Sequence, residues 1–135
     1  MKARDLMTSN PEFVTPDDTV SRAAQIMRDV DVGIVPVVED RNSMRLKGVI
    51  TDRDIAVRHV AEGHQEDCRV EAHMSSGRLG TVNADSDQEE VINLMEREQV
   101  RRVPVVDEGA RLIGINAQAD MATRIGPTAP EKVEE

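Results

Sequence analysis

Aromatic side chains are almost absent from this sequence, which contains no tryptophan or tyrosine and has Phe13 as its only phenylalanine. Proteins bind single-stranded nucleic acids by stacking bases on aromatic side chains, so a platform of that kind is excluded. Positive charge is also scarce, since 17 Lys and Arg stand against 26 Asp and Glu and the formal net charge is −9. Contact with a phosphate backbone needs clustered positive charge. We therefore expect no nucleic-acid partner.

Cysteine and long apolar runs are scarce as well. Cys68 is the only cysteine, so no disulfide can form within the chain, and this favours a reducing compartment. No apolar stretch approaches the roughly 20 residues of a bilayer-spanning helix. Residues 1–7 are charged rather than apolar, unlike a secretory signal. These absences predict a cytoplasmic protein without a membrane partner.

No assembled catalytic or metal-binding motif is recognisable. His59, His64 and His73 lack a ligand spacing such as His-x-x-x-His, so we interpret them as surface histidines in solvent. Cys68 directly follows an acidic pair, which makes it a poor nucleophile. We predict no metal site, no required cofactor and no enzymatic activity.

An internal repeat is the main feature that the sequence does contain. The segment Val-Pro-Val-Val at residues 35–38 returns at residues 103–106, 68 residues later, and an acidic pair follows it both times. Residues 46–50 match residues 112–116 at an offset of 66, because the second turn is two residues shorter. Residues 70–74 look like a counterpart of residues 3–7. A half-chain of this size buries too little surface on folding to be stable by itself, so we expect the two halves to share a core.

Each copy predicts a short strand, a helix, a strand, a turn, a strand and a helix. The β-branched run at 34–38 indicates a buried strand whose proline suits an edge or a bulge, and 46–50 is its return strand. Ile55, Ala56, Val60 and Ala61 predict the apolar face of a helix that ends near Gly63. The predicted fold class is α/β (α+β), with two βαββα repeats packed about a pseudo-twofold axis. We place the first repeat at 1–67, the second at 68–126, and an acidic flexible tail at 127–135.

One short motif follows the last strand of the first copy. Residues 48–54 read Gly-Val-Ile-Thr-Asp-Arg-Asp, which is a strand running into a helix start. Thr51 places a hydroxyl beside unpaired helix amides, which favour an anion such as phosphate. The Asp54 carboxylate can accept two hydrogen bonds from a vicinal diol such as the ribose hydroxyls. Thr-x-x-Asp is also a capping box, and the tetrapeptide taken alone favours that interpretation.

The duplicated unit and its motifs closely resemble a tandem cystathionine-β-synthase (CBS) domain pair over nearly the whole chain. The residues that carry the resemblance are Asp5-Leu6-Met7, Val35-Pro36-Val37-Val38, Gly48-Val49-Ile50-Thr51-Asp52-Arg53-Asp54, Val100-Arg101-Arg102-Val103-Pro104-Val105-Val106 and Leu112-Ile113-Gly114-Ile115.

The resemblance implies a ligand class and the residues that bind it. CBS pairs bind adenosyl compounds such as AMP, ADP, ATP or S-adenosylmethionine in clefts between their repeats. By this resemblance Thr51 contacts phosphate and Asp54 holds the ribose hydroxyls. Arg53, between them in the sequence, is a locally available positive charge. The adenine pocket would be lined by Val14, Thr15, Pro16, Ile34, Val35 and Pro36.

The second copy departs from this pattern. Asp120 keeps the ribose position, but Ala117 stands where the first copy has Thr51. Loss of a hydrogen bond to a charged group costs about 1.5–3 kcal/mol, which is about tenfold or more in affinity. We therefore predict one competent site per chain and a weaker or empty second cleft. The residues of that second cleft are Asp120, Arg102, Val103 and Pro104. Arg102 and its neighbour Arg101 either contact phosphate or a partner, or keep a solvated strand edge from aggregating.

Two functions remain open on these grounds. In the first, the chain is a regulatory module that senses an adenosyl ligand in an inter-repeat cleft and acts on a separate effector protein. In the second, it is a ligand-free CBS dimer that serves as a protein-interaction module, with Thr51 and Asp54 acting only as caps. The resemblance implies a homodimer in both cases.

Overall fold

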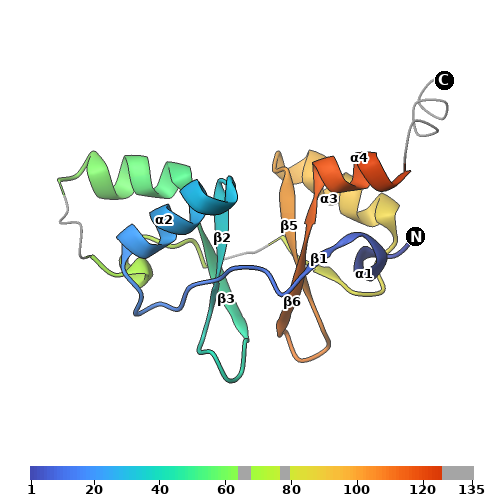
Figure 1. The fold of residues 1–135 in the computed structure, drawn as a ribbon, viewed down its shortest axis with the longest axis horizontal. Helices are drawn as coiled ribbons and strands as arrows, with labels where there is room; N and C mark the ends of the chain where they lie inside the picture. Colours follow the sequence, from blue (N-terminus) through green and yellow to red (C-terminus); the bar gives the residue numbers. More distant parts are fainter. Residues whose placement is uncertain (64–67, 77–79, 126–135) are drawn as a thin grey trace. The chain divides into compact units, whose positions relative to one another are not determined.

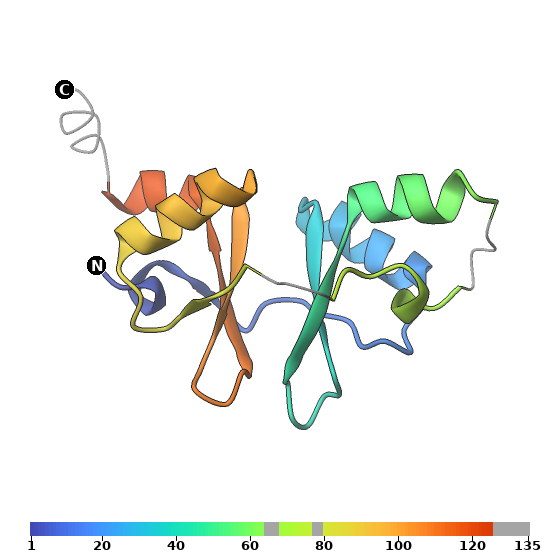
Figure 2. The same ribbon diagram turned by 180° about the vertical axis from the view of Figure 1, so that it is seen from behind.

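The structure is a computed structural model that describes residues 1–63, 68–76 and 80–125 (Figures 1 and 2). The chain forms two compact units. The central unit is Glu12–Leu79, and the terminal unit combines Met1–Pro11 with Gly80–Glu135. The first segment of the chain thus lies in the unit that holds the second repeat. The tail predicted at 127–135 lies outside the described residues.

The central unit is built on an antiparallel hairpin of β2 (Ile34–Val38) and β3 (Leu46–Thr51). The predicted strands at 34–38 and 46–50 are confirmed, with β3 one residue longer. The register shifts between Val37 and Val38, shortly after the proline, as a bulge in this strand would require. Val14 adds a parallel bridge to Val37. The helices of this unit are α2 (Val20–Val30), the π-helix η1 (Asp54–Val60) and the short 3-10 helix η2 (Val70–Ala72).

Helix α2 supplies much of the core of the central unit. It begins at Thr19, whose Oγ1 accepts a hydrogen bond from the Arg22 N–H at 3.1 Å, and it ends at Asp31 in the left-handed conformation. Its buried side chains, which recur at helical spacing, pack with the inward-facing residues of the hairpin. The members of this core are Val14, Val20, Ala23, Ile26, Val35, Val37, Ile50 and Val70.

The terminal unit contains a four-stranded sheet in the order β1-β6-β5-β4. Its strands are β1 (Thr8–Ser9), β4 (Val82–Asn83), β5 (Arg102–Val106) and β6 (Leu112–Ala117), and its helices are α1 (Ala3–Leu6), α3 (Gln88–Glu98) and α4 (Gln118–Ile125). Strands β5 and β6 form the same bulged hairpin as β2 and β3. Buried apolar side chains from α1, α3, α4 and the sheet form a separate core in this unit.

Matching contacts in the two units confirm the predicted correspondence between residues 70–74 and 3–7. In the central unit Ser75 bridges Val49 on β3, and in the terminal unit Thr8 pairs with Ile115 on β6. Both pairs are antiparallel and lie at equivalent positions of the repeat. The pairing of β1 with β6 explains why the first residues of the chain join the terminal unit.

The predicted α+β fold with two repeats is confirmed, but the helix after β3 differs from its prediction. The Ala61 N–H donates to the carbonyl of Ala56 at 3.0 Å, which is the i→i+5 bond of a π-helix. Val60, expected on the apolar face, is 65% exposed, and the buried residues of η1 are Asp54 and His59. Gly63 adopts the predicted left-handed conformation. No helix within the described residues is long and apolar enough to cross a bilayer.

Candidate functional site

Thr51 and Asp54 lie where β3 ends and η1 begins. The Thr51 N–H donates to Oδ2 of Asp54 at 2.9 Å, and the Asp54 N–H donates to Oγ1 of Thr51 at 3.0 Å. This reciprocal pair is a capping box. The cap described above as an alternative is therefore present in the structure, and a ligand that uses these side chains must compete with it.

The second oxygen of Asp54 also faces a protein donor. Asp54 is 8% exposed, and its Oδ1 lies 3.9 Å from Nε of Arg58, four residues later on η1. Arg53, in contrast, is exposed to solvent. The helix start therefore combines a nearly buried carboxylate, a partly buried hydroxyl and an exposed guanidinium.

The predicted adenine-lining residues fall at two positions along β2. Ile34 lies directly opposite Thr51 in the hairpin. Val14 instead bridges Val37, three residues or roughly 10 Å further along the strand, and its N–H donates to the carbonyl of Pro36. Because this bridge is parallel, Thr15 and Pro16 continue toward the Val38 end. The structure thus brings the 34–36 segment to the Thr51 helix start, and places the 14–16 segment along the same strand at its other end.

The residues predicted for the second cleft all lie in the terminal unit. Oδ2 of Asp120 accepts a hydrogen bond from the Thr8 hydroxyl at 3.5 Å. Arg102 lies opposite Ala117, at the position where Ile34 lies opposite Thr51 in the first copy. Val103 and Pro104 are buried on the same strand. In the second copy Arg102 thus replaces Ile34, and Ala117 replaces Thr51.

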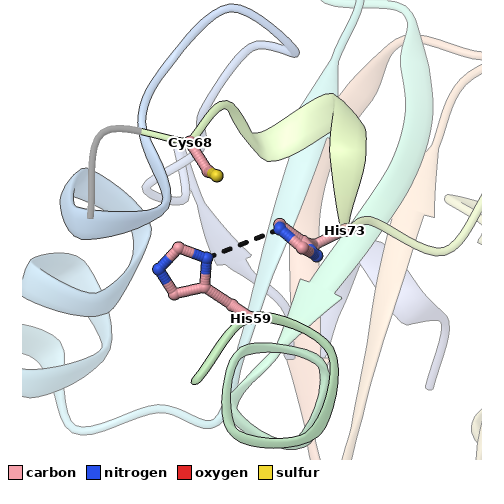
Figure 3. A group of neighbouring side chains, drawn as sticks. All are labelled: His59, Cys68 and His73. Carbon is pink, nitrogen blue, oxygen red and sulfur yellow. Dashed lines mark hydrogen bonds between the residues drawn. The ribbon is translucent and has the colours of Figure 1, made fainter. Parts of the chain in front are cut away.

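The interpretation of the histidines as solvated surface residues is wrong for two of the three. His59 and His73 are 6% and 2% exposed, and Nδ1 of His59 lies 3.4 Å from Nε2 of His73. The Cys68 side chain turns toward the same place (Figure 3). One donor atom from each of the three residues lies within 4.8 Å of the other two. His64 lies outside the described residues.

Two elements of the central unit present this histidine–cysteine cluster. His59 is on η1, whereas Cys68 and His73 flank η2 (Figure 3). Hydrogen bonds to the start of α2 hold the second segment, since the Val20 N–H donates to the carbonyl of Cys68 at 2.8 Å. Sequence spacing could not reveal the cluster, because motifs such as His-x-x-x-His describe ligands on one helix only.

The internal repeat does contain a signal for the cluster. The match of residues 70–74 with 3–7 aligns His73 with Leu6, a fully buried residue of the terminal core. The offset of 66 aligns His59 with Ile125. His73 therefore stands at the position of a buried leucine of the other copy, and His59 stands where the other copy has isoleucine in its sequence.

The sequence matches the family model described as CBS domain over residues 3–59 and 70–115. Hypoxic response protein 1 of Mycobacterium tuberculosis is 37% identical over 123 residues, which are 91% of this chain and 84% of that protein. A solved structure described as Hypoxic Response Protein I with two coordinated zinc ions is 36% identical, with a TM-score of 0.83 over 93% of this chain and 100% of the other.

A further solved structure is the CBS domain pair of protein MJ0100 in complex with 5-methylthioadenosine and S-adenosyl-L-methionine. It is 26% identical to this chain, with a TM-score of 0.78, and the match covers 95% of this chain and 98% of the other. The matched segments of the family model coincide with the two copies of the internal repeat. The chain therefore belongs to the CBS domain family and contains a pair of CBS repeats.

Proposed function

We propose that the chain is a regulatory module that binds an adenosyl compound, of the class of AMP, ADP, ATP or S-adenosylmethionine, and passes the signal to a separate protein. The observation that carries the proposal is the Thr51–Asp54 pair at the start of η1. The structural neighbour MJ0100, solved with two adenosyl compounds, supports the ligand class.

The chemistry of this helix start suits a nucleotide. The Thr51 hydroxyl lies beside the first backbone amides of η1, which favour a phosphate oxygen. The Asp54 carboxylate suits the paired ribose hydroxyls, and Ile34 opposite Thr51 offers apolar surface to the base. Exposed Arg53 supplies the positive charge that an acidic chain needs near a bound phosphate.

Competition with the cap does not prevent this binding. A capping side chain contributes about 0.5–2 kcal/mol to stability. The ion pair with Arg58, at i and i+4, contributes about 0.3–0.5 kcal/mol. Each hydrogen bond to a charged acceptor contributes about 1.5–3 kcal/mol, so two bonds from a ribose diol are comparable in energy with the contacts that they replace.

The family and the sequence support a wider assignment. We propose a cytoplasmic homodimer that is not an enzyme, that requires no cofactor, and that acts on an effector protein rather than on nucleic acid or a membrane. The first copy provides the competent cleft. Asp120, Arg102, Val103 and Pro104 form a weaker one, because Ala117 lacks the hydroxyl of Thr51.

Calorimetric titration of the full chain with AMP, ATP and S-adenosylmethionine tests the proposal. We expect at least one ligand to bind below millimolar concentration, and Asp54→Ala and Thr51→Ala to remove or weaken that binding. Asp120→Ala is the matched control from the second copy and should leave most of it in place. Absence of binding by the wild type, or wild-type affinity in Asp54→Ala, would contradict the proposal.

The ligand-free interaction module remains the competing function. The observation that favours it is that both Asp54 oxygens face protein donors, so the pair also serves as a complete cap. In this case Asp54→Ala changes stability without changing any ligand affinity, and the same titrations separate the two functions.

Binding of a transition-metal ion is a second candidate function. The gathering of His59, Cys68 and His73 favours it, and the relative solved with two coordinated zinc ions supports it. Metal binding does not exclude the adenosyl function, because the two sets of residues are separate.

A further inference from the structure

We infer, resting on the metal-binding function proposed above, that His59, Cys68 and His73 are the protein ligands of a single metal ion of the Zn²⁺ class. The cluster lies wholly within the central unit and is drawn in Figure 3. Its three side chains carry the donor atoms that zinc prefers in proteins, namely imidazole nitrogen and thiolate sulfur.

The distance between the two imidazoles fits a shared ion. Zinc binds imidazole nitrogen at about 2.0–2.1 Å, so two nitrogens of one tetrahedral site lie roughly 3.3–3.4 Å apart. Nδ1 of His59 lies 3.4 Å from Nε2 of His73. A direct hydrogen bond from N–H usually spans about 2.7–3.2 Å, so the observed distance is long for such a bond. The ring planes are inclined at 80°, so the two rings are not stacked.

The thiol lies close enough to complete the set. A tetrahedral site with zinc–sulfur bonds of about 2.3 Å places sulfur roughly 3.6 Å from each nitrogen. The donor atoms of the cluster all lie within 4.8 Å of one another, so a movement of roughly 1 Å brings Cys68 to bonding distance. Cys68 is only partly buried, which leaves its side chain room for this movement.

Hydrogen bonds hold the backbone that carries His73 in place. The His73 N–H donates to the carbonyl of Val70 at 2.9 Å, and the Val70 N–H donates to the carbonyl of Asp18 at 2.8 Å. On the other side, η1 is a π-helix, a form that occurs frequently at functional sites. Residues five apart on an α-helix point about 140° away from each other. The wider π turn brings Asp54 and His59 closer to one face, and both are buried.

The donor set selects the kind of ion. Magnesium and calcium prefer carboxylate and carbonyl oxygens, and the cluster offers none among its three side chains. Imidazole with thiolate suits zinc, and cobalt(II) as its spectroscopic substitute. Three protein ligands leave the fourth tetrahedral position for water or another small ligand. The bound ion would join η1 to the η2 segment and so fix the helix that begins at Asp54.

Cobalt and zinc titrations of the full chain, purified under reducing conditions and treated with a chelator, test the assignment. We expect one ion per chain, intense visible bands of tetrahedral cobalt, and a near-ultraviolet thiolate-to-cobalt charge-transfer band. Cys68→Ser should abolish the charge-transfer band. His59→Ala and His73→Ala should each weaken zinc binding about 100-fold or more, because loss of a mere outer-shell partner already costs about 10–100-fold.

Glu71→Ala is the matched control, since Glu71 is an exposed carboxylate on the same segment, and it should bind as the wild type does. Circular dichroism of each metal-free variant separates loss of a ligand from loss of the fold. If a histidine variant fails to fold, the assignment is tested by two observations only: the charge-transfer band of the wild type and the loss of that band in Cys68→Ser. Zinc binding that all three substitutions leave unchanged overturns the ligand assignment only. Absence of zinc and cobalt binding by the wild type overturns the metal-binding function as well.

Discussion

The backbone N–H of Thr51 donates to the Asp54 carboxylate, and the N–H of Asp54 donates to the Thr51 hydroxyl in return. The pair therefore satisfies its own helix start without any ligand. Thr51 and Asp54 thus have two possible roles: their sequence motif indicates nucleotide binding, and their hydrogen bonds form a helix cap. Substitutions that keep one property and remove the other can separate them.

Removal of the Thr51 hydroxyl should destabilise the protein through loss of the cap. Thr51→Ala is expected to lower the free energy of unfolding by about 1 kcal/mol, the usual cost of losing a capping side chain. Thr51→Ser keeps the hydroxyl and is the control, with a stability close to that of the wild type. Urea denaturation of the three proteins measures the difference. Equal stability of the alanine and serine variants would show that the cap contributes nothing.

Addition of a methyl group at Gly48 should be costly for a different reason. A Cβ at this position would collide with the backbone carbonyl of Ser75, which cannot move as a side chain can. We expect Gly48→Ala to destabilise the protein by about 1–3 kcal/mol, the range for overpacking. Gly114→Ala should do the same in the second copy, where Thr8 and Met7 crowd the glycine.

Gly109→Ala is the control for both glycine variants. Its added Cβ would meet nothing closer than 3.6 Å, which is ordinary contact. Its stability should lie within about 0.5 kcal/mol of the wild type. If chemical denaturation gives Gly48→Ala the same free energy of unfolding as Gly109→Ala, the close approach of residues 74–75 to β3 is contradicted.

Metal removal should lower the thermal stability of the wild type. An ion present at 100 times its dissociation constant stabilises the folded state by about 2.7 kcal/mol. For a chain of this size that corresponds to a rise in melting temperature of roughly 5–10 °C. Scanning calorimetry with zinc and then with excess chelator should show this change in the wild type and its loss in Cys68→Ser. A zinc effect of the same size in both proteins would exclude the thiol as a ligand.

Metal and nucleotide binding should be coupled through η1. This helix carries Asp54 at its start and His59 near its end, so an ion that fixes His59 also orders the helix start. We expect saturating zinc to raise the affinity for AMP about fivefold or more, and AMP to raise the zinc affinity by the same factor. Calorimetry in both orders measures the two factors. Identical AMP affinity with and without zinc would show that the sites are independent.

The sequence predicted the parts of the fold that local patterns determine. The β-branched run with its proline located β2, and the duplication located β5 and β6. Pairing between distant segments was not predictable in the same way. Nothing local to residues 8–9 indicates that they pair with β6, and this pairing places the start of the chain in the terminal unit.

The sites were predictable only where their residues form a continuous motif. Thr51 and Asp54 belong to one turn, so their joint position followed from spacing alone. His59 and His73 come from two elements, and the π geometry of η1 buries His59 where an ordinary amphipathic pattern would bury Val60. A systematic comparison of the two copies, which aligns His73 with buried Leu6, would have indicated the burial of one histidine.

The affinity of Asp54→Asn for AMP, set against that of the wild type, is the most direct test of the proposed function. The asparagine amide can still accept the hydrogen bond from the Thr51 N–H, so the cap survives, whereas the charge that would hold the ribose diol is lost. We predict at least about tenfold weaker binding, the equivalent of one bond to a charged group, with little change in stability. AMP affinity equal to that of the wild type, or a wild type that binds no adenosyl compound, would contradict the account.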